Sequence, residues 1–236
     1  MEFGADRQMI QAAAQAAAEE RSAFIRRTYL HLAGAIGLFI ALEALLLRMP
    51  FAEQLVRRMT TGYSWIVVLL LFMAVGWVAD RWARSATSIG MQYLGLLLYT
   101  VAEAIIFLPL LYIAVFLIED PNVIKSAGLL TLTLFAGLTG TVFITRKDFS
   151  FLRTALMVGG FVALGIILAS ILIGFSLGTL FSVAMVVLAG GYIVYYTSNV
   201  LHHYRTDQHV AAALALFAAV ALMFWYILML FMGDRD

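Results

Sequence analysis

Long apolar stretches, each about the length of a membrane crossing, alternate with short polar segments along most of the chain. A transmembrane helix needs about 20 predominantly apolar residues, because it rises about 1.5 Å per residue through the bilayer. Seven stretches approach or meet this length, and we predict a helix in each. Their approximate limits are 29–47, 64–79, 93–117, 123–144, 154–173, 177–198 and 210–232. The predicted fold class is therefore all-α, a polytopic membrane protein built as a bundle of seven transmembrane helices.

Polar segments at the ends and between the spans complete the predicted organisation. We expect a cytoplasmic N-terminal segment over 1–28, a seven-helix transmembrane domain over 29–233 and a polar tail over 234–236. Alanine runs in 8–27 favour a short helix that leads into the first span. The links between the spans, including 51–63, are too short to hold a folded soluble domain.

Proline and glycine refine the expected packing. Pro109 lies inside the third span, where a kink or an early end of the helix is expected. Small residues recur four positions apart, as in Ala33 with Gly37 and Ala136 with Gly140. This spacing predicts places where helix backbones approach closely.

Cations are unevenly distributed between the two sides that alternate links would occupy. With the N-terminus in the cytoplasm, ten lie on the inner side and five on the outer side. The inner set is Arg7, Arg21, Arg26, Arg27, Arg81, Arg84, Arg146, Lys147, Arg153 and Arg205, and the outer set is Arg48, Arg57, Arg58, Lys125 and Arg235. Because cytoplasmic links carry the excess of Lys and Arg, this distribution favours an N-terminus inside. The C-terminus then lies outside if the seventh span crosses fully, and inside if that span is re-entrant.

Composition indicates a bilayer rather than water as the surrounding solvent. The chain is 64% hydrophobic and 12% charged, with a mean hydropathy of +0.97, whereas a soluble domain is about 45–50% apolar and about 25% charged. A net charge of +1 gives no reason to expect a nucleic-acid partner, and the absence of cysteine excludes disulfide and thiolate chemistry. We expect the lipid bilayer as the main partner and no soluble small-molecule substrate.

Two carboxylic acids lie inside predicted spans, where a charged group costs about 2.5–3.5 kcal/mol on insertion scales. Glu103 is near the middle of the third span, and we take it as the candidate ion or proton site, together with Tyr99, Thr100 and Tyr196. Glu43, toward the outer end of the first span, is a secondary candidate. The alternative is that each is a protonated structural acid bonded to a neighbouring helix.

Two patterns that suggest enzymatic or metal chemistry have unsuitable spacing. The segment 174–178 matches the G-x-S-x-G pattern of hydrolases, but the histidines that follow the sixth span lie a full membrane width away, about 30 Å. One polar cluster has the right atoms for a metal but no tight helical ligand spacing. Its members are His202, His203, Asp207 and His209. We therefore predict no catalytic residue, no metal, no cofactor and no enzymatic activity.

One polar link and the spans after it carry a family resemblance. Arg146, Lys147 and Asp148 form a predicted cytoplasmic loop whose cations fix the topology, and Asp148 or Ser150 is placed to cap the next helix. The eight residues 145–152, Thr-Arg-Lys-Asp-Phe-Ser-Phe-Leu, resemble a hallmark loop of the bacterial Bax inhibitor family, most closely its YccA branch. The sixth span ends in Tyr-Thr-Ser-Asn-Val-Leu-His over 196–202, which is similar to the same branch, and the seventh span also fits.

This resemblance implies a particular helix arrangement, and it allows one known ion-conduction mechanism of the family to be compared with this sequence. Six helices would surround a short, central seventh helix. Some bacterial members are pH-sensitive calcium leak channels that use a pair of aspartates, one on each of the last two helices. The matching positions here are Tyr196 and Ala219, and no acid occurs over 210–232. Calcium conduction by that carboxylate pair is therefore not expected.

The YccA branch implies a binding role instead. Its member is a substrate and modulator of the membrane-bound AAA protease FtsH, and the polar N-terminal segment would be the part that the protease grips. We therefore expect a protein of the bacterial inner membrane that interacts with the FtsH complex in membrane protein quality control. The alternative is a pH-sensitive calcium or proton leak channel.

Overall fold

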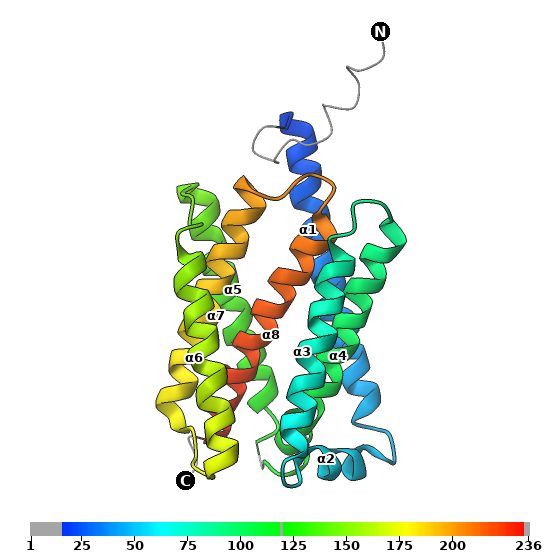
Figure 1. Ribbon diagram of the computed structural model, residues 1–236, viewed down its shortest axis with the longest axis vertical. Helices are drawn as coiled ribbons and strands as arrows, with labels where there is room; N and C mark the ends of the chain where they lie inside the picture. Colours follow the sequence, from blue (N-terminus) through cyan, green and yellow to red (C-terminus); the bar gives the residue numbers. More distant parts are fainter. Residues whose placement is uncertain (1–15, 119, 234–236) are drawn as a thin grey trace.

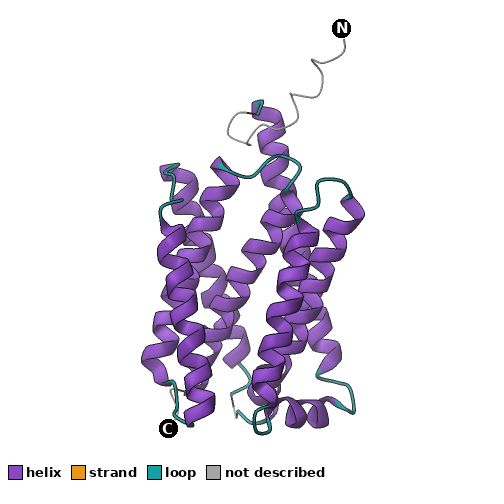
Figure 2. Cartoon of the chain, in the orientation of Figure 1, coloured by secondary structure: helices purple, strands orange, loops and turns teal. Residues whose placement is uncertain are grey.

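The computed structural model describes residues 16–118 and 120–233, and all regular secondary structure within these ranges is helical (Figure 2). The helices are α1 (Ala18–Leu46), α2 (Ala52–Thr60), α3 (Ser64–Ala83), α4 (Ile89–Phe116), α5 (Val123–Thr145), α6 (Leu152–Ile173), α7 (Gly178–His202) and α8 (His209–Gly233). In this part of the chain, seven helices are long and apolar enough to cross a membrane, and α2 is the one that is not. The prediction of an all-α, seven-helix membrane protein is confirmed.

The seven long helices run alternately down and up, so that the direction of the chain reverses from each long helix to the next (Figure 1). We call the end where α1 begins the upper end and the end where α8 finishes the lower end, as they are drawn in Figure 1. The links 84–88, 146–151 and 203–208 lie at the upper end, whereas α2 lies at the lower end. The first and last described helices therefore have their free ends on opposite sides of the bundle.

Helix α8 lies at the centre of the bundle. It packs against α1, α3, α4, α5 and α7, and most of its side chains are buried. Its upper half is rich in alanine, and small side chains let neighbouring helices approach closely where no hydrophobic effect drives them together. The central position agrees with the prediction, but α8 has 25 residues, as many as α7. It is not short because it runs obliquely through the bundle (Figure 1), and a tilted helix needs more residues to cross.

Helices α3 and α4 approach each other closely at a glycine that sequence spacing did not single out. A Cβ atom on Gly95 would lie 2.5 Å from the carbonyl oxygen of Ala79 and 2.6 Å from the backbone nitrogen of Ala83. No real Cβ occupies such a position, so this contact requires glycine. Around Gly37 and Gly140, by contrast, the described chain places nothing within 4 Å of a Cβ, and the predicted close packing at these two positions is wrong. Gly37 is exposed and Gly140 is half-buried.

Helix α2 replaces part of a segment predicted to be only a link. Its apolar side chains Ala52, Val56 and Met59 are buried against α3 and α4, while an exposed ion pair joins Arg57 to Glu53 at 2.7 Å. The apolar residues are spaced four and three positions apart, which is the amphipathic helix pattern. The segment therefore lies across the lower end as a surface helix.

Two further boundaries differ from the sequence reading. Helix α1 begins at Ala18, so the residues from there to 28 continue the first membrane helix. Residues 1–15 lie outside the described chain, and the predicted limit at residue 28 stays a prediction. Helix α4 runs through Pro109 to Phe116, so the early end expected there does not occur.

Candidate functional site

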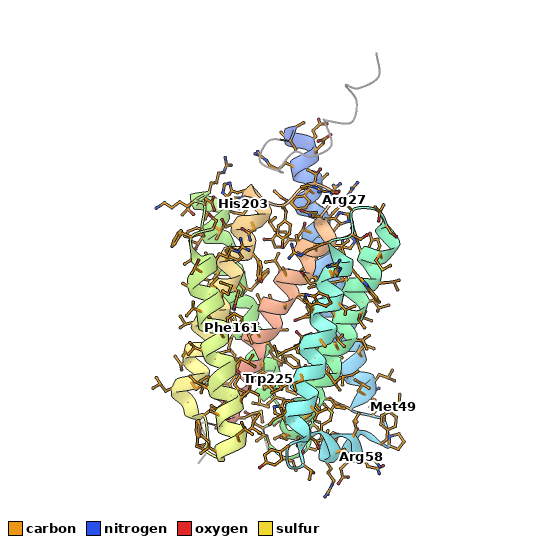
Figure 3. All side chains as sticks on the ribbon, in the orientation of Figure 1. Arg27, Met49, Arg58, Phe161, His203 and Trp225 are labelled. Carbon is orange, nitrogen blue, oxygen red and sulfur yellow. The ribbon has the colours of Figure 1, made fainter. Side chains whose placement is uncertain are left out.

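A cavity of about 500 Å³ lies between α3 and α4 on one side and α6 and α7 on the other, with α8 behind it. These two helix pairs do not pack closely against each other, which leaves room between them. The side chains that line the cavity include Trp65, Phe72, Tyr99, Glu103, Phe107, Ala163, Tyr192, Tyr196, Ala219, Trp225 and Met229. In Figure 3, Trp225 marks the lower half of α8 and Phe161 marks α6. Of the predicted site residues, Glu103, Tyr99 and Tyr196 line this cavity.

Glu103 lies in the wall of this cavity, midway along α4. Its side chain is only 5% exposed, and it is one of the side chains that line the cavity. Tyr99, one helical turn earlier, lies within hydrogen-bonding reach of the Glu103 carboxyl group. Among the described residues that line the cavity, Glu103 is the one carboxylic acid. An intramembrane acid that faces a cavity is the arrangement expected of an ion or proton site.

Two tyrosines of α7 form the opposite wall. The rings of Tyr192 and Tyr196 are stacked, with centroids 5.9 Å apart and planes at 15°. The Tyr192 hydroxyl donates a hydrogen bond of 2.8 Å to the carbonyl oxygen of Leu156 on α6, which fixes its position. Tyr196 lines the same cavity as Tyr99 and Glu103, so these three predicted residues are brought together.

A series of polar groups continues from these tyrosines to the upper end of the bundle. Tyr204, Arg84 and Asp80 lie close enough to influence one another electrostatically. The Arg84 Nε atom donates to Asp80 at 2.8 Å, and this bond raises the pKa of the guanidinium group. Burial raises the pKa of the Tyr204 hydroxyl. Polar and charged groups therefore gather at the upper end of the bundle, on the side of the cavity where Tyr196 lies.

Thr100 does not belong to this site. Its hydroxyl donates a hydrogen bond of 2.9 Å to the carbonyl oxygen of Leu96 in the same helix. The side chain lines a separate groove between α1 and α4, which also contains His31 and Tyr93. Threonine one position from Tyr99 points about 100° away around a helix of 3.6 residues per turn, so sequence proximity was a poor guide.

Glu43 also lies apart from the cavity lining. It is 4% exposed on α1, and neither carboxylate oxygen has a hydrogen-bond partner among the described residues. The preceding turn carries Phe39, whose ring meets Phe107 edge-on at 5.1 Å. Because Glu103 lies one turn above Phe107 and Glu43 one turn below Phe39, this aromatic contact lies between the levels of the two acids. The two candidate acids therefore occupy different sites.

The loop of Arg146, Lys147 and Asp148 is fastened to the upper end of α7. Arg146 adopts a left-handed backbone conformation, φ +50°, where α5 ends. The Asp148 carboxylate accepts the Ser150 backbone N–H at 2.8 Å and pairs with His203 at 3.0 Å. These contacts, the Ser150 hydrogen bond first, lower the pKa of the Asp148 carboxyl group.

Ser198 on α7 completes this attachment and links the two segments that carry the family resemblance. Its hydroxyl oxygen, which is fully buried, accepts the Phe149 backbone N–H at 2.8 Å. The segment 145–152 therefore packs on the segment 196–202. The expected capping of α6 does not occur, because the N-cap is Phe151, without a side-chain bond, and Asp148 turns toward α7 instead.

The other polar groups weighed from the sequence are distributed over both ends. Ser176 lies in the lower link between α6 and α7, whereas the three histidines near the end of α7 and the start of α8 lie at the upper end. His203 pairs with Asp148, while the His209 ring contacts His31 at 4.9 Å. Within 16–118 and 120–233, no three His, Asp or Glu residues gather in a group that could hold a metal ion.

Several residues of the site were missed by sequence reasoning. Asp80 and Arg84 are four residues apart at the end of the second span, a spacing that could have indicated an ion pair on one helix face. Tyr192 could have been noticed because it precedes Tyr196 by one helical turn. Nothing in the sequence indicates that Tyr204, in a link, turns back toward the helices, since that depends on how the link folds.

Comparison with known proteins identifies relatives of this chain. The family model described as "Inhibitor of apoptosis-promoting Bax1" matches residues 21–236, nearly the whole chain. A curated relative, the uncharacterized protein PA2604 of Pseudomonas aeruginosa, is 29% identical over 225 residues. This alignment covers 92% of each chain. The match therefore includes all seven long helices and the cavity between them.

Proposed function

Since the chain belongs to the Bax inhibitor family of multi-pass membrane proteins, we propose that it is a proton leak pathway in which Glu103 carries the proton. The observation that supports this proposal is the position of the Glu103 carboxyl group, buried in mid-membrane yet facing the cavity. A purely structural acid would be packed against a partner on a neighbouring helix. Here no hydrogen bond joins the Glu103 carboxyl group to a neighbouring helix among the described residues, and the side chain lines the cavity.

A proton fits this site better than calcium does. Calcium takes 6–8 oxygen ligands in proteins, usually several of them carboxylates. The cavity lining of the described chain supplies one carboxyl group and several phenols. Tyr196 and Ala219, the positions that correspond to the aspartate pair of calcium-conducting relatives, both line the cavity and carry no charge. A single titrating acid beside phenol groups suits proton transfer.

The proposed route has two parts. In the lower half of the membrane, the proton reaches Glu103 through the cavity. In the upper half, it passes along the hydroxyl groups of Tyr99, Tyr196 and Tyr204 to the pair of Asp80 with Arg84 at the surface. Hydroxyl groups can donate and accept a hydrogen bond at once, as a proton relay requires.

A flux assay with two matched variants tests this function. The purified protein is reconstituted in vesicles that contain a pH-sensitive dye, and a potassium gradient with valinomycin drives protons inward. Glu103→Gln should lower the protein-dependent flux by about 100-fold, the size of a positioned proton-transfer group. Glu43→Gln is the control, because this acid is equally buried but lies outside the cavity, and it should leave the flux unchanged. Equal flux in wild type and Glu103→Gln would contradict the proposal.

A second candidate function is modulation of the membrane AAA protease FtsH. In this proposal the protein lies in the bacterial inner membrane, and its N-terminus faces the cytoplasm. This function is supported by the start of α1, whose first turn carries exposed Glu19 and Glu20 and stands above the bundle (Figure 1). Residues 1–15, which precede this helix, lie outside the described chain, and the proposal is that the protease grips this segment. The resemblance to the YccA branch, which suggested this role, stays a prediction.

Turnover measurements test the second candidate. Residues 1–18 are deleted, and the half-life of the protein is measured in membranes with and without active FtsH. The deletion should lengthen the half-life only where the protease is active. Thermal unfolding of the same variant in detergent serves as the control for folding. Unchanged turnover would remove this candidate.

A further inference from the structure

We infer that the lower, aromatic part of the cavity binds an acyl chain of a membrane lipid, which enters from the side between α3 and α6. This inference does not rest on proton conduction. A bound chain would block the lower half of the proposed proton route, so protons would pass only while the slot is empty. It commits to one occupant, hydrocarbon from the surrounding bilayer. Three properties of the cavity support it: where it opens, what lines it and how long it is.

The cavity opens toward the part of the surface that faces hydrocarbon. Helices α3 and α6 form its two front walls, but α3 packs on α4 and α6 packs on α7, and the two do not pack closely on each other (Figure 1). The outward side chains beside the opening are apolar, with Leu71 on α3 61% exposed and Phe161 on α6 69% exposed. In a membrane-spanning bundle, such surfaces contact lipid tails. The medium at the opening is therefore hydrocarbon.

The lining of the lower part does not suit water. A buried water molecule needs 2–4 polar partners. The walls here are formed mainly by rings and aliphatic groups such as Trp65, Phe107 and Met229. The hydroxyl of Tyr226 is one polar group in this part of the lining, fewer than a buried water molecule needs. The indole N–H of Trp225 already donates to the sulfur of Met229 at 3.1 Å, so it is not free to bind water. Water can be held near Glu103 and the tyrosines, whereas the part below them suits an apolar occupant.

The cavity is long as well as apolar. Below the tyrosines, its lining extends from Leu177, just before α7, to Leu188, midway along that helix. At 1.5 Å per residue this corresponds to a length of roughly 16 Å, about half the thickness of the hydrocarbon layer and therefore the depth of one leaflet. The whole cavity, which continues up to Tyr196, holds about 500 Å³, so its apolar part is a narrow slot. An extended chain fills a slot of this shape better than a compact ligand does.

Fluorescence quenching by brominated lipid tests this inference directly. The substitutions Trp65→Phe, Trp77→Phe and Trp82→Phe leave Trp225 as the sole tryptophan, at the back of the cavity. The protein is reconstituted in vesicles of phosphatidylcholine with plain or dibrominated acyl chains. If a chain occupies the slot, the brominated lipid should reduce the Trp225 fluorescence. Equal Trp225 fluorescence in the two lipids would overturn the inference.

Two further substitutions separate a lipid in the slot from lipid around the protein. Ala163→Phe adds a ring inside the cavity wall and should restore the Trp225 fluorescence in brominated vesicles. Gly165→Phe adds the same ring on the exposed face of α6, where nothing lies within 4 Å, and should leave the quenching as it was. If Ala163→Phe does not fold, Ala219→Phe fills the cavity from α8. Quenching that persists in a folded, plugged variant would also overturn the inference.

Discussion

The imidazole Nε2 atom of His203 lies 3.0 Å from a carboxylate oxygen of Asp148, although 55 residues separate them. This contact joins the link between α5 and α6 to the end of α7. Both side chains are about half exposed, so the energy of the pair is small. Its value is positional: with Ser198, it holds the 146–151 loop on the upper end of the bundle.

The pH dependence of stability should reveal Asp148. Its pKa is lower in the folded protein than in the unfolded chain, first because of the Ser150 N–H and then because of His203. Such a carboxylate stabilises the fold above its unfolded pKa of about 3.9, and the contribution is lost as the pH falls through the lower folded value. Asp148→Ala should therefore cost less than about 1 kcal/mol at pH 7. The cost should disappear in acid, as measured by thermal unfolding in detergent.

His203→Gln is the companion variant for this prediction. Because the Ser150 N–H is the larger cause of the lowered pKa, removing the imidazole should preserve most of the pH-dependent cost of Asp148→Ala. The measurement introduces Asp148→Ala into the wild-type chain and into the His203→Gln chain, and compares the melting temperatures at neutral and acid pH. If His203→Gln abolished the difference between the two pH values, the ion pair rather than the backbone hydrogen bond would dominate.

The substitution Ser198→Ala removes a buried hydroxyl and should destabilise the protein by about 1–3 kcal/mol, which is the cost of leaving a buried backbone N–H unpaired. The affected donor is the Phe149 N–H, which the Ser198 oxygen accepts at 2.8 Å. Ser170→Ala is the matched control, because its hydroxyl only donates to the Ile167 carbonyl of its own helix. The melting temperatures of Ser198→Ala and Ser170→Ala are compared, and the loss should be larger for Ser198→Ala. Equal losses would show that the contact between loop and α7 contributes little.

Substitution of Gly95 by alanine should force α3 and α4 apart. The new Cβ meets backbone atoms of Ala79 and Ala83, which cannot rotate away as a side chain can. We expect a loss of about 1–3 kcal/mol, the usual cost of overpacking. Gly128→Ala, on α5 with open space around the new atom, should instead be neutral or stabilising by up to about 1 kcal/mol. Thermal unfolding of both variants in detergent checks the contrast, and similar effects would contradict it.

Glu43 should be replaceable by leucine without loss of stability. Both of its carboxylate oxygens are buried without a partner among the described residues, and an unpaired polar group is costly to bury. Glu43→Leu should be neutral or stabilising, whereas Glu43→Gln, which keeps unpaired polar atoms, should gain less. Unfolding experiments at neutral pH compare the two. A clear destabilisation by leucine would mean that the carboxyl group has a role that its packing does not reveal.

The sequence predicted the crossing helices well because the physical rule behind them is simple. A backbone in hydrocarbon must satisfy its own hydrogen bonds, so each long apolar stretch forms a helix. Even Pro109 did not interrupt α4, since its ring removes one hydrogen bond in a helix whose neighbours hold it in place. The same rule says nothing about amphipathic surface helices, and α2 was missed for that reason.

The candidate site was only partly predictable. Glu103 could be singled out because an acid inside an apolar stretch is conspicuous. Its grouping with Tyr196 came from a resemblance, and its separation from Thr100 required knowing which way each helix face turns. The contribution of Tyr204 depends on the path of a link, and the cavity itself depends on two helix pairs that fail to meet. Neither feature leaves a local pattern of residues.

The central position of α8 also sets the order in which the protein can be assembled. All five helices that α8 packs against precede it in the chain, so they enter the bilayer before their common partner has been synthesised. Until residues 209–233 leave the ribosome, the surfaces that later bury α8 have only lipid or one another to contact. A chain interrupted before His209 would therefore have the outer helices of the bundle without the helix that they enclose. Insertion of α8 is then the step that completes the bundle.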